Sequence, residues 1–312
     1  MAALMQADLS EHLRRVASGK VREIYEIDDS SLLFVTTDRI SAYDVVLKNG
    51  IDQKGAILTQ LSEFWFNLLQ SRMPGLRTHF ISLGIPPALQ KRLRPDLVKK
   101  LGSRSMAVKR VKVFPIESIV RGYIAGSAWS SYHNDGTVCG ITLPAGLKES
   151  EKLERPLWTP STKADLGSKD ENISPEAAAR IVGQEYADQI EALSLQIYEE
   201  ASAYAAERGI IIADTKLEFG LDESATPATV VLIDEVLTPD SSRFWNAGTY
   251  EIGRGQESYD KQYLRDWLVR NGLRGKPGVE MPTDVAMNTL GRYREAYHSL
   301  VGMVWDMATS EV

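Results

Sequence analysis

The sequence has one cysteine, four histidines and no long apolar run among its 312 residues. The single Cys139 excludes an intramolecular disulfide, and the scattered histidines cannot supply the clustered ligands of a zinc site. No stretch approaches the roughly 20 apolar residues of a membrane helix, and the first ten residues lack the basic and apolar regions of a secretory signal. We therefore expect a soluble, cytoplasmic protein, in which any metal ion is bound through oxygen atoms.

Basic residues are also in deficit, because 36 Lys and Arg against 42 Asp and Glu give a net charge of -6. Proteins that bind nucleic acid normally present a broad basic surface, so we expect no nucleic-acid partner. A small anionic substrate remains compatible with local clusters of basic residues. The motifs G-x-x-x-x-G-K-[ST] and G-x-G-x-x-G are absent, so ATP, if bound, is expected between sheets rather than on a phosphate-binding loop.

The order of the predicted elements favours an α+β fold with antiparallel sheets over a doubly wound parallel sheet. Strands are expected at 18–27, 32–36, 77–82, 105–109, 209–220 and 230–236. Helices are expected at 9–16, 59–69, 174–209, 259–270 and 283–307, the third of them capped by Ser174. The segment 140–171 has no clear periodicity and is expected to be a long functional loop. We predict a sheet-rich N-terminal lobe over 1–114 and a C-terminal α+β lobe over 115–312.

The most informative segment is the strand-like run 209–220, which sorts charge and apolar bulk onto opposite faces. Side chains alternate along a strand, so Asp214, Lys216 and Glu218 share one face. The next strand, 230–236, places Asp234 directly after four apolar residues. If the two strands form a hairpin, a lysine and several carboxylates meet at the margin of a buried sheet, where charges must pair or bind metal. This arrangement predicts a site for a magnesium nucleotide.

Further segments concentrate reactive residue types, and each has a plainer alternative. They are 18–22, 37–44, 121–127, 159–165 and 238–245. Lys20 and Arg22 are candidates for contacts with phosphate, although composition alone favours an exposed hairpin face. Asp44 fits a turn, and Arg121 beside two glycines fits either an anion site or a helix start. None of these segments is decisive alone.

In combination, the ordered motifs closely resemble the SAICAR synthetase family of purine biosynthesis. The segments that carry the resemblance are 18–25, 37–44, 115–129, 159–165, 170–174, 214–220, 234–245 and 258–267. It extends from about Ser18 to Trp267, and no motif of the family pattern is broken. The chain is similar to the longer single-function form and shows no sign of a fused carboxylase.

The resemblance implies an ATP-dependent ligase that condenses carboxyaminoimidazole ribonucleotide (CAIR) with L-aspartate. The products are the succinocarboxamide SAICAR, ADP and phosphate, and the reaction proceeds through an acyl phosphate. The family fold is related to ATP-grasp enzymes and protein kinases, with ATP between the lobes. We expect a monomer, with a homodimer as the alternative.

The resemblance also assigns roles to residues of this chain. Contacts with ATP are expected from Lys20, Arg22, Lys109, Arg110, Val113 and Lys216. Mg²⁺ is expected on Glu218 and Asp234. Contacts with the nucleotide substrate are expected from Asp44, Arg121, Ser127, Lys163, Asp214 and Arg243. Lys216, Asp214 and Arg243 are the expected catalytic residues, and the aspartate site is not assigned.

Two other functions compete with the ligase. A kinase would share the lobes, the lysine and the carboxylates, but a protein kinase should also contain His-Arg-Asp and Asp-Phe-Gly, and neither tripeptide occurs. A non-catalytic nucleotide-binding module would bind ATP without turnover, and the many reactive side chains on the proposed site faces argue against it.

Overall fold

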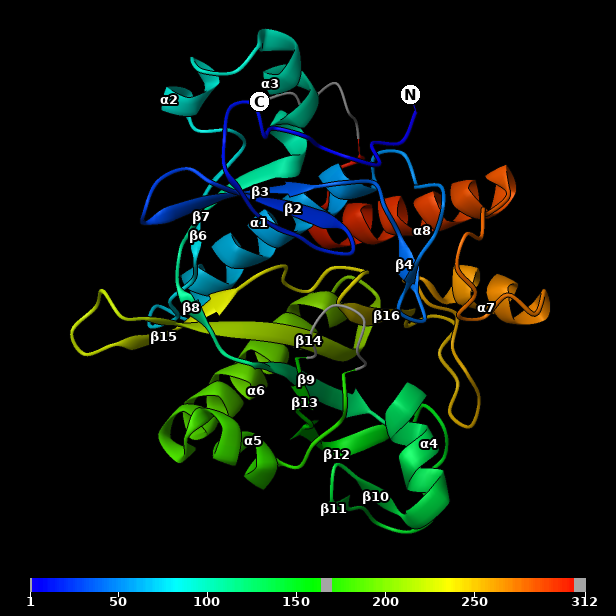
Figure 1. Cartoon of the computed structure of the whole chain (residues 1–312). Coiled ribbons are helices and arrows are strands. Elements are labelled where there is room, and N and C mark those ends of the chain that lie inside the picture. The colour runs from blue at the N-terminus through cyan, green and yellow to red at the C-terminus, as the bar shows by residue number, and fades with distance from the viewer. Residues whose placement is uncertain (1, 164–169, 306–312) are drawn as a thin grey trace.

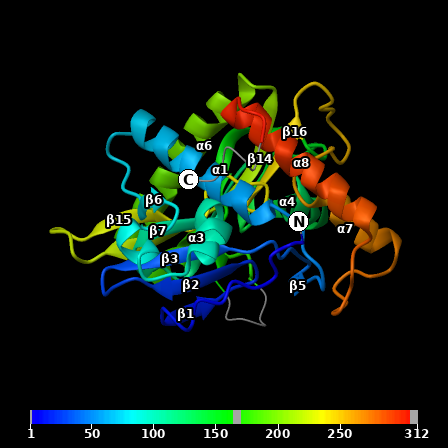
Figure 2. The ribbon, with the colours of Figure 1, turned by 90° about the horizontal axis from the view of Figure 1, so that it is seen from above.

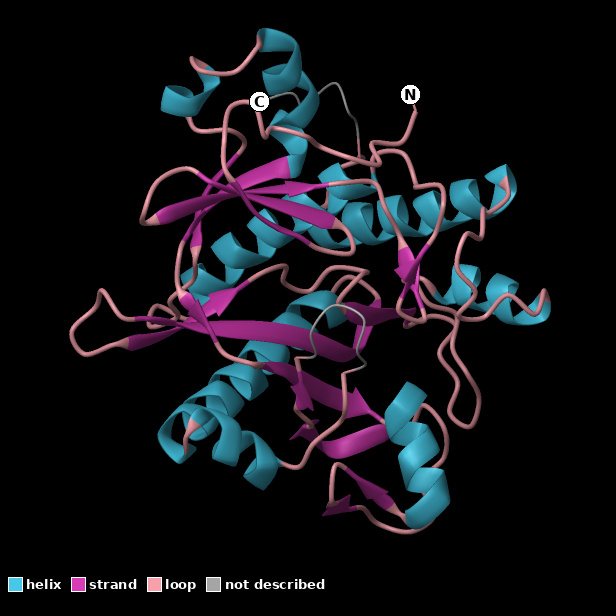
Figure 3. Cartoon of the chain, viewed as in Figure 1, coloured by secondary structure: helices cyan, strands magenta, loops and turns pink. Residues whose placement is uncertain are grey.

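Two antiparallel sheets, one above the other in Figure 1, frame the computed structural model, which describes residues 2–163 and 170–305. Helices lie between the sheets and cover their outer faces (Figure 3). The predicted α+β class with antiparallel sheets is confirmed. No helix in the described ranges is long and apolar enough to cross a membrane.

The upper sheet is built from the first third of the chain. Its spatial order is β1 (Arg15–Ser18), β2 (Arg22–Glu26), β3 (Ser31–Thr36), β7 (Ser105–Lys109) and β6 (Phe80–Leu83). Beside it lie the short hairpin β4 (Ser41–Ala42) and β5 (Val45–Val46), the helices α2 (Pro87–Gln90) and α3 (Pro95–Leu101), and the 3-10 turn η1 (Gly102–Arg104).

Two expectations for this sheet are wrong. The predicted helix at 9–16 is a single turn, in which the Leu9 carbonyl accepts from the amides of His12 and Leu13. One turn is enough to bury both leucines in the core, and the chain then enters β1. The predicted strand 18–27 is interrupted at 19–21, so β1 and β2 form a hairpin and Lys20 lies in its turn.

The lower sheet is organised around one long strand, β14 (Ile210–Asp222). Its partners are β9 (Ile116–Tyr123), β15 (Thr229–Ile233), β16 (Ser242–Asn246) and β8 (Lys112–Val113), while β12 (Lys152–Trp158) and β13 (Ser161–Thr162) pair with β9. Glu218 lies opposite Ile233, so the predicted hairpin of the two charged strands is confirmed. The segment 140–171 is not a continuous loop, because it contains β11 (Ile141–Thr142), β12 and β13.

Two helices, α5 (Pro175–Val182) and α6 (Gln184–Ala206), pack on the lower sheet. Helix α1 (Lys54–Arg72) packs on the upper sheet and contacts α8 (Thr283–Val301), which in turn contacts α7 (Gln262–Arg270). Helix α4 (Gly126–Asp135) is followed by β10 (Thr137–Val138), which pairs with β11. Ser174 caps α5 as predicted, because its Oγ accepts from the Ala177 amide at 3.2 Å. The single helix predicted from Ser174 is divided by Gly183, whose φ of 93° cannot continue a helix. The helix α8 ends at Val301 and is capped by Gly302, whereas the predicted end at 307 lies outside the described residues.

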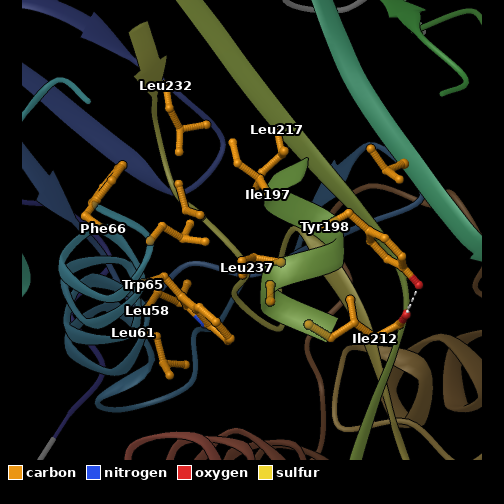
Figure 4. Packing of buried hydrophobic residues seen from close by; sticks show 14 of the residues in the cluster. Leu58, Leu61, Trp65, Phe66, Ile197, Tyr198, Ile212, Leu217, Leu232 and Leu237 are labelled. Atoms are coloured by element: carbon orange, nitrogen blue, oxygen red, sulfur yellow. Dashed lines mark hydrogen bonds between the residues drawn. The ribbon is translucent and has the colours of Figure 1, made fainter. Parts of the chain in front are cut away.

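The largest apolar core is continuous from the upper sheet to α6. Figure 4 shows Trp65 of α1 pointing towards α6, with Ile197 of α6 and Leu217 of β14 on the other side of the core. Seen from above, α8 runs beside α1 (Figure 2), so the end of the chain packs against a helix near its start. The division into lobes at 114/115 therefore remains a proposal about ligand binding, since the core itself crosses it.

Candidate active site

A chain of alternating charges runs across β14 at its middle. Lys216 Nζ lies 2.7 Å from Glu117 Oε1 of β9 and 3.1 Å from Glu218 Oε1. The other oxygen of Glu218 accepts from the amine of Lys163, which follows β13. The predicted alternation therefore brings Lys216 and Glu218 together, and the strand pairing adds Glu117 and Lys163 from distant parts of the sequence.

Burial and neighbouring charges shift the pKa values of the residues in this row of charges. Burial opposes the charge of Lys216, but the carboxylates of Glu218 and Glu117 outweigh it and raise the pKa of the amine well above its usual value. Burial also raises the pKa of Glu117, against the opposing effect of Lys216. Lys216 is therefore a permanent cation at neutral pH.

The end of β15 brings a second carboxylate next to this chain. Asp234 has a φ of 64°, so the chain turns sharply there, and its carboxylate accepts from the guanidinium of Arg22 in the upper sheet. Burial opposes the charge of Asp234, but Arg22 and Lys216 outweigh it and lower the pKa of the carboxyl group. The predicted proximity of Asp234 to the charged face of β14 is present.

Two arginines meet one carboxylate on the other side of Lys216. Asp214 accepts from Arg243 of β16 and, at 3.5 Å, from Arg121 of β9. Arg121 also donates to Ser127 Oγ at 3.3 Å. A side chain at Gly126, where φ is 56°, would lie 2.4 Å from an Arg243 nitrogen, so glycine lets the backbone come close to this guanidinium. Two guanidiniums and one carboxylate leave an excess positive charge suited to a phosphate.

A cavity of about 280 Å³ opens beside the charges around Lys216 and those around Asp214. Its lining includes the expected Arg121, Ser127, Asp214, Lys216 and Arg243. It also includes residues that the sequence did not single out: Glu117, Asp240, Ser241, Ser242, Asp260 and Arg265. All six lie in motifs that carried the family resemblance, but only the folded structure shows that their side chains line one cavity.

Asp240 shows how this region is held. Its carboxylate lies 2.7 Å from Lys54 Nζ and 3.1 Å from Lys261 Nζ, and it accepts from the hydroxyl of Tyr293. The side chains of Asp240 and Lys54 are almost fully buried. Burial opposes the charge of Asp240, but both lysines outweigh it and lower the pKa of its carboxyl group. The cluster ties α1, α7 and α8 to the wall of the cavity.

The remaining expected residues lie outside the cavity lining. Lys20 pairs with Asp44 at 2.7 Å, with both side chains exposed. Lys109 pairs with Asp222 at the far end of β14, roughly 20 Å from Lys216 along the strand at about 3.3 Å per residue. Asp44 itself lines an adjoining hollow that shares Ser127, Arg243 and Arg265 with the main cavity.

The segment expected to hold adenine joins the two sheets. Arg110 pairs with Glu26 of β2, and Val113 of β8 pairs with Gly220 of β14 while its side chain is 48% exposed. A bare backbone edge of this kind can bond a flat heterocycle through its N–H and C=O groups. The geometry leaves the assignment of this segment as a prediction.

The residues expected to hold Mg²⁺ suit a magnesium nucleotide better than a free ion. In the ranges 2–163 and 170–305, no group of three His, Cys, Asp or Glu side chains could hold a metal ion. Glu218 and Asp234 nevertheless lie at adjacent positions of the hairpin, and Mg²⁺ commonly takes only one or two carboxylates, with water and phosphate completing its shell. The pair therefore fits the ion once a nucleotide is bound.

Comparison with known proteins identifies the family. The family model described as SAICAR synthetase matches residues 15–282. The phosphoribosylaminoimidazole-succinocarboxamide synthases of Cyberlindnera jadinii and Saccharomyces cerevisiae are 55% and 48% identical, each over 97% of this chain and 100% and 99% of their own lengths.

Solved structures agree. The SAICAR synthase from Saccharomyces cerevisiae complexed with SAICAR superposes with a TM-score of 0.88 at 48% identity, covering 97% of this chain and 99% of that one. A SAICAR synthetase in complex with ADP superposes with a TM-score of 0.68 at 27% identity, covering 93% and 99%. The chain therefore belongs to the SAICAR synthetase family.

Proposed function

We propose that this chain carries out the SAICAR synthetase reaction in the cavity beside Lys216 and Arg243. As a member of the family, it is an ATP-dependent ligase that joins the carboxylate of CAIR to the amine of L-aspartate, in purine biosynthesis. One observation supports placing the active site here: two clusters of opposite charges lie next to each other on β14. Lys216 lies between two carboxylates, and Asp214, two residues away, lies between two guanidiniums.

The chemistry explains why such charges are needed. A carboxylate is a poor acyl donor because its leaving group would be oxide. Transfer of the γ-phosphoryl group of ATP to a carboxylate oxygen of CAIR releases ADP and makes an acyl phosphate. The amine of L-aspartate then attacks the carbonyl carbon, a C–N bond forms, the C–O bond to phosphate breaks, and the amine loses a proton. Transfer between two anions depends mainly on neutralisation and alignment.

Each group has a place in this scheme. Lys216 neutralises the transferring phosphoryl group, because neighbouring carboxylates keep its amine charged. Arg121, Ser127 and Arg243 hold the 5′-phosphate of CAIR, and Asp214 orients both guanidiniums while it faces the ribose or amino group. Lys163 moves from Glu218 to the phosphates when ATP binds.

The remaining contacts are also proposals. ATP lies between the sheets, with Arg22, Lys20 and Lys109 on its phosphates and residues 110–113 on adenine. Asp44 contacts CAIR through the adjoining hollow. Bound Mg²⁺ would be held by Glu218 and Asp234 and would neutralise charge on the phosphates. We further propose a cytoplasmic monomer acting on these small molecules, with a homodimer as the alternative.

The test is ADP release by the purified protein with MgATP, with CAIR and L-aspartate omitted in turn and the product mass recorded. ADP and SAICAR should appear only when both substrates are present. ADP release that does not depend on aspartate, with no amide product, would instead support a kinase, and ATP binding without turnover would support a binding module.

A variant tests the placement separately. Glu218→Gln keeps the size of the side chain but removes a charge that contacts both Lys163 and Lys216, so ADP formation should be abolished while the far-UV circular dichroism stays near wild type. Full activity in Glu218→Gln would remove Glu218 from the site. Glu223→Gln is a matched control, since Glu223 forms an exposed pair with Lys112.

A further inference from the structure

An arginine that follows β3 holds the turn between β1 and β2. The guanidinium of Arg39 donates from Nε to the Lys20 carbonyl at 3.1 Å and from Nη2 to the Gly19 carbonyl at 2.8 Å. From Nη1 it donates to the Met5 carbonyl at 3.0 Å and to Glu23 Oε1 at 2.7 Å. Each nitrogen of this guanidinium therefore binds the protein itself, and two of them bind consecutive carbonyls of one turn.

The same segment holds the rest of this turn. The Val21 carbonyl accepts from the Thr37 amide at 2.8 Å and from the Thr37 hydroxyl at 2.6 Å. Each of the three carbonyls at 19–21 thus accepts a hydrogen bond from Thr37 or Arg39. The conformation of the turn is therefore set by a segment that lies outside the β1–β2 hairpin.

Asp38, which lies between these two residues in the sequence, fixes the segment to the core. Its Oδ1 accepts from the Gly55 amide at the start of α1, at 2.9 Å, and from Arg104 Nη1 at 2.8 Å. Its Oδ2 accepts from the Leu4 amide at 2.7 Å. Thr37 and Asp38 are both fully buried. The segment is therefore a fixed support for the turn.

A buried carboxylate orients the guanidinium. Glu23 of β2 is 1% exposed, and Arg15 Nη1 lies 4.0 Å from its Oε2. A buried carboxylate is costly unless a cation pairs with it, so Glu23 and Arg39 fix each other's position. The planar fork of arginine then binds two carbonyls at once, whereas lysine offers a single nitrogen on a flexible stem.

The turn matters because it carries Lys20. The amine of Lys20 lies 2.7 Å from Asp44 Oδ1, and the two side chains are 40% and 51% exposed. An exposed ion pair of this kind contributes little to holding a side chain in place, so the position of the amine depends on the main chain of the turn. On a loose turn, the lysine would have to be ordered when a phosphate binds, at a cost in conformational entropy.

We propose that Arg39 is a positioning residue, which holds the turn 19–21 so that Lys20 is presented to the phosphates of ATP between the sheets. The inference rests on the proposed contact between Lys20 and ATP. Arg39 acts through Lys20 and touches no substrate. Its effect on the apparent affinity for MgATP cannot exceed that of Lys20, because a turn that is correctly formed for a fraction of the time weakens binding by that fraction.

Two substitutions separate positioning from charge balance. Arg39→Lys keeps a cation that can balance Glu23 but loses the fork on the Gly19 and Lys20 carbonyls. Glu23→Gln keeps an acceptor for Nη1 and leaves the fork in place, but removes the buried negative charge. Positioning predicts that only Arg39→Lys weakens MgATP binding, whereas a role limited to the ion pair predicts that Glu23→Gln is the more damaging change.

The measurement is KM for MgATP and kcat, from ADP release at saturating CAIR and L-aspartate, with thermal denaturation of each variant. We expect Lys20→Met to raise this KM about tenfold, as for the loss of one hydrogen bond to a charged group. Arg39→Lys should raise it about fivefold in the wild-type background but less than about twofold in the Lys20→Met background, since the two residues act as one unit. Glu23→Gln should keep the wild-type KM, as should the control Arg94→Lys, because Arg94 forms an exposed pair with Asp96.

Three results would overturn the proposal for Arg39. The first is an unchanged KM for MgATP in Arg39→Lys, with or without a lower kcat, because a purely structural role lowers the amount of active enzyme and leaves KM alone. The second is an equal rise of KM in the Lys20→Met background, because Arg39 would then act on more than Lys20. The third is a rise in Glu23→Gln as large as that in Arg39→Lys, because the ion pair alone would then explain both.

Lys20→Met distinguishes these failures from failure of the proposed ATP site. If Lys20→Met keeps the wild-type KM, the proposed contact between Lys20 and ATP is wrong; if Lys20→Met raises KM while Arg39→Lys does not, only the role of Arg39 is wrong. Should Arg39→Lys not fold, Arg39→Gln combined with Glu23→Gln removes both buried charges together with the same bonds to the turn, and its KM decides the question in the same way.

Discussion

Substitution of Lys216 by methionine tests the electrostatic basis of the proposed reaction. Methionine keeps an unbranched side chain of similar length but has no charge. In the wild type, the amine lies 2.7 Å from Glu117 and 3.1 Å from Glu218. The variant would leave these two carboxylates facing each other without the cation between them.

Two magnitudes follow from this geometry. Loss of one preorganised group that stabilises developing charge typically lowers kcat by about 10²–10³, which corresponds to about 3–4 kcal/mol in the barrier. Loss of one partner from a fully buried ion pair costs about 3–5 kcal/mol of stability. Because the side chain of Lys216 is 32% exposed, solvent screens the pair and we expect a smaller loss, about 1–2 kcal/mol.

The assay is ADP release at saturating MgATP, CAIR and L-aspartate, with urea denaturation followed in parallel. Lys48→Met is the matched control, because Lys48 pairs with Glu280 on the exposed surface, where its side chain is 67% exposed, and this variant should keep wild-type kcat and stability. A kcat of Lys216→Met within threefold of the wild type would refute the role of the amine in phosphoryl transfer. A loss of kcat that only accompanies unfolding would refute it as well.

Three further substitutions test individual contacts of the fold. Ser174→Ala removes the cap of α5 and should lower the free energy of unfolding in urea by about 1 kcal/mol; an unchanged value would contradict the cap. Gly122→Ala would place Cβ 1.8 Å from the Tyr198 hydroxyl and should cost about 1–3 kcal/mol, whereas Gly75→Ala, with nothing within 4 Å, should change the melting temperature little; equal melting temperatures would be inconsistent with the close packing. The lowered pKa of Asp240 means that its ionisation stabilises the fold fully above about pH 4, the pKa of an unfolded aspartate, and that this contribution is lost as the pH falls towards the folded pKa. Asp240→Asn should therefore flatten the dependence of unfolding free energy on pH below about 4, and an unchanged slope would show that Asp240 does not contribute to it.

The charged hairpin shows what local sequence can predict. Alternation along β14 placed Lys216 and Glu218 on one face, and four apolar residues before Asp234 marked β15, so both the strands and their shared charge were visible in short windows. The cap at Ser174 was visible for the same reason, because it depends on a bond between residues three apart.

Contacts between distant segments could not be read in this way. Arg22 and Asp234 are 212 residues apart, and nothing near either one indicates the other. Glu117 was part of a family motif, but its contact with Lys216 depends on the register of β9 against β14. The break at Gly183 was missed because apolar spacing continues across it, whereas its φ of 93° is a property of the folded backbone.

The packing of α8 against α1 sets an order of events during synthesis on the ribosome. Gln60 and Tyr297, which meet across these helices, are separated by 237 positions. At about 5–20 residues per second, translation of that interval takes roughly 10–50 s. During this interval α1 has been synthesised, but Tyr293, Tyr297 and Leu300 of α8, which belong to the same apolar core, have not. Helix α1 therefore reaches its final packing only after α8 has been synthesised.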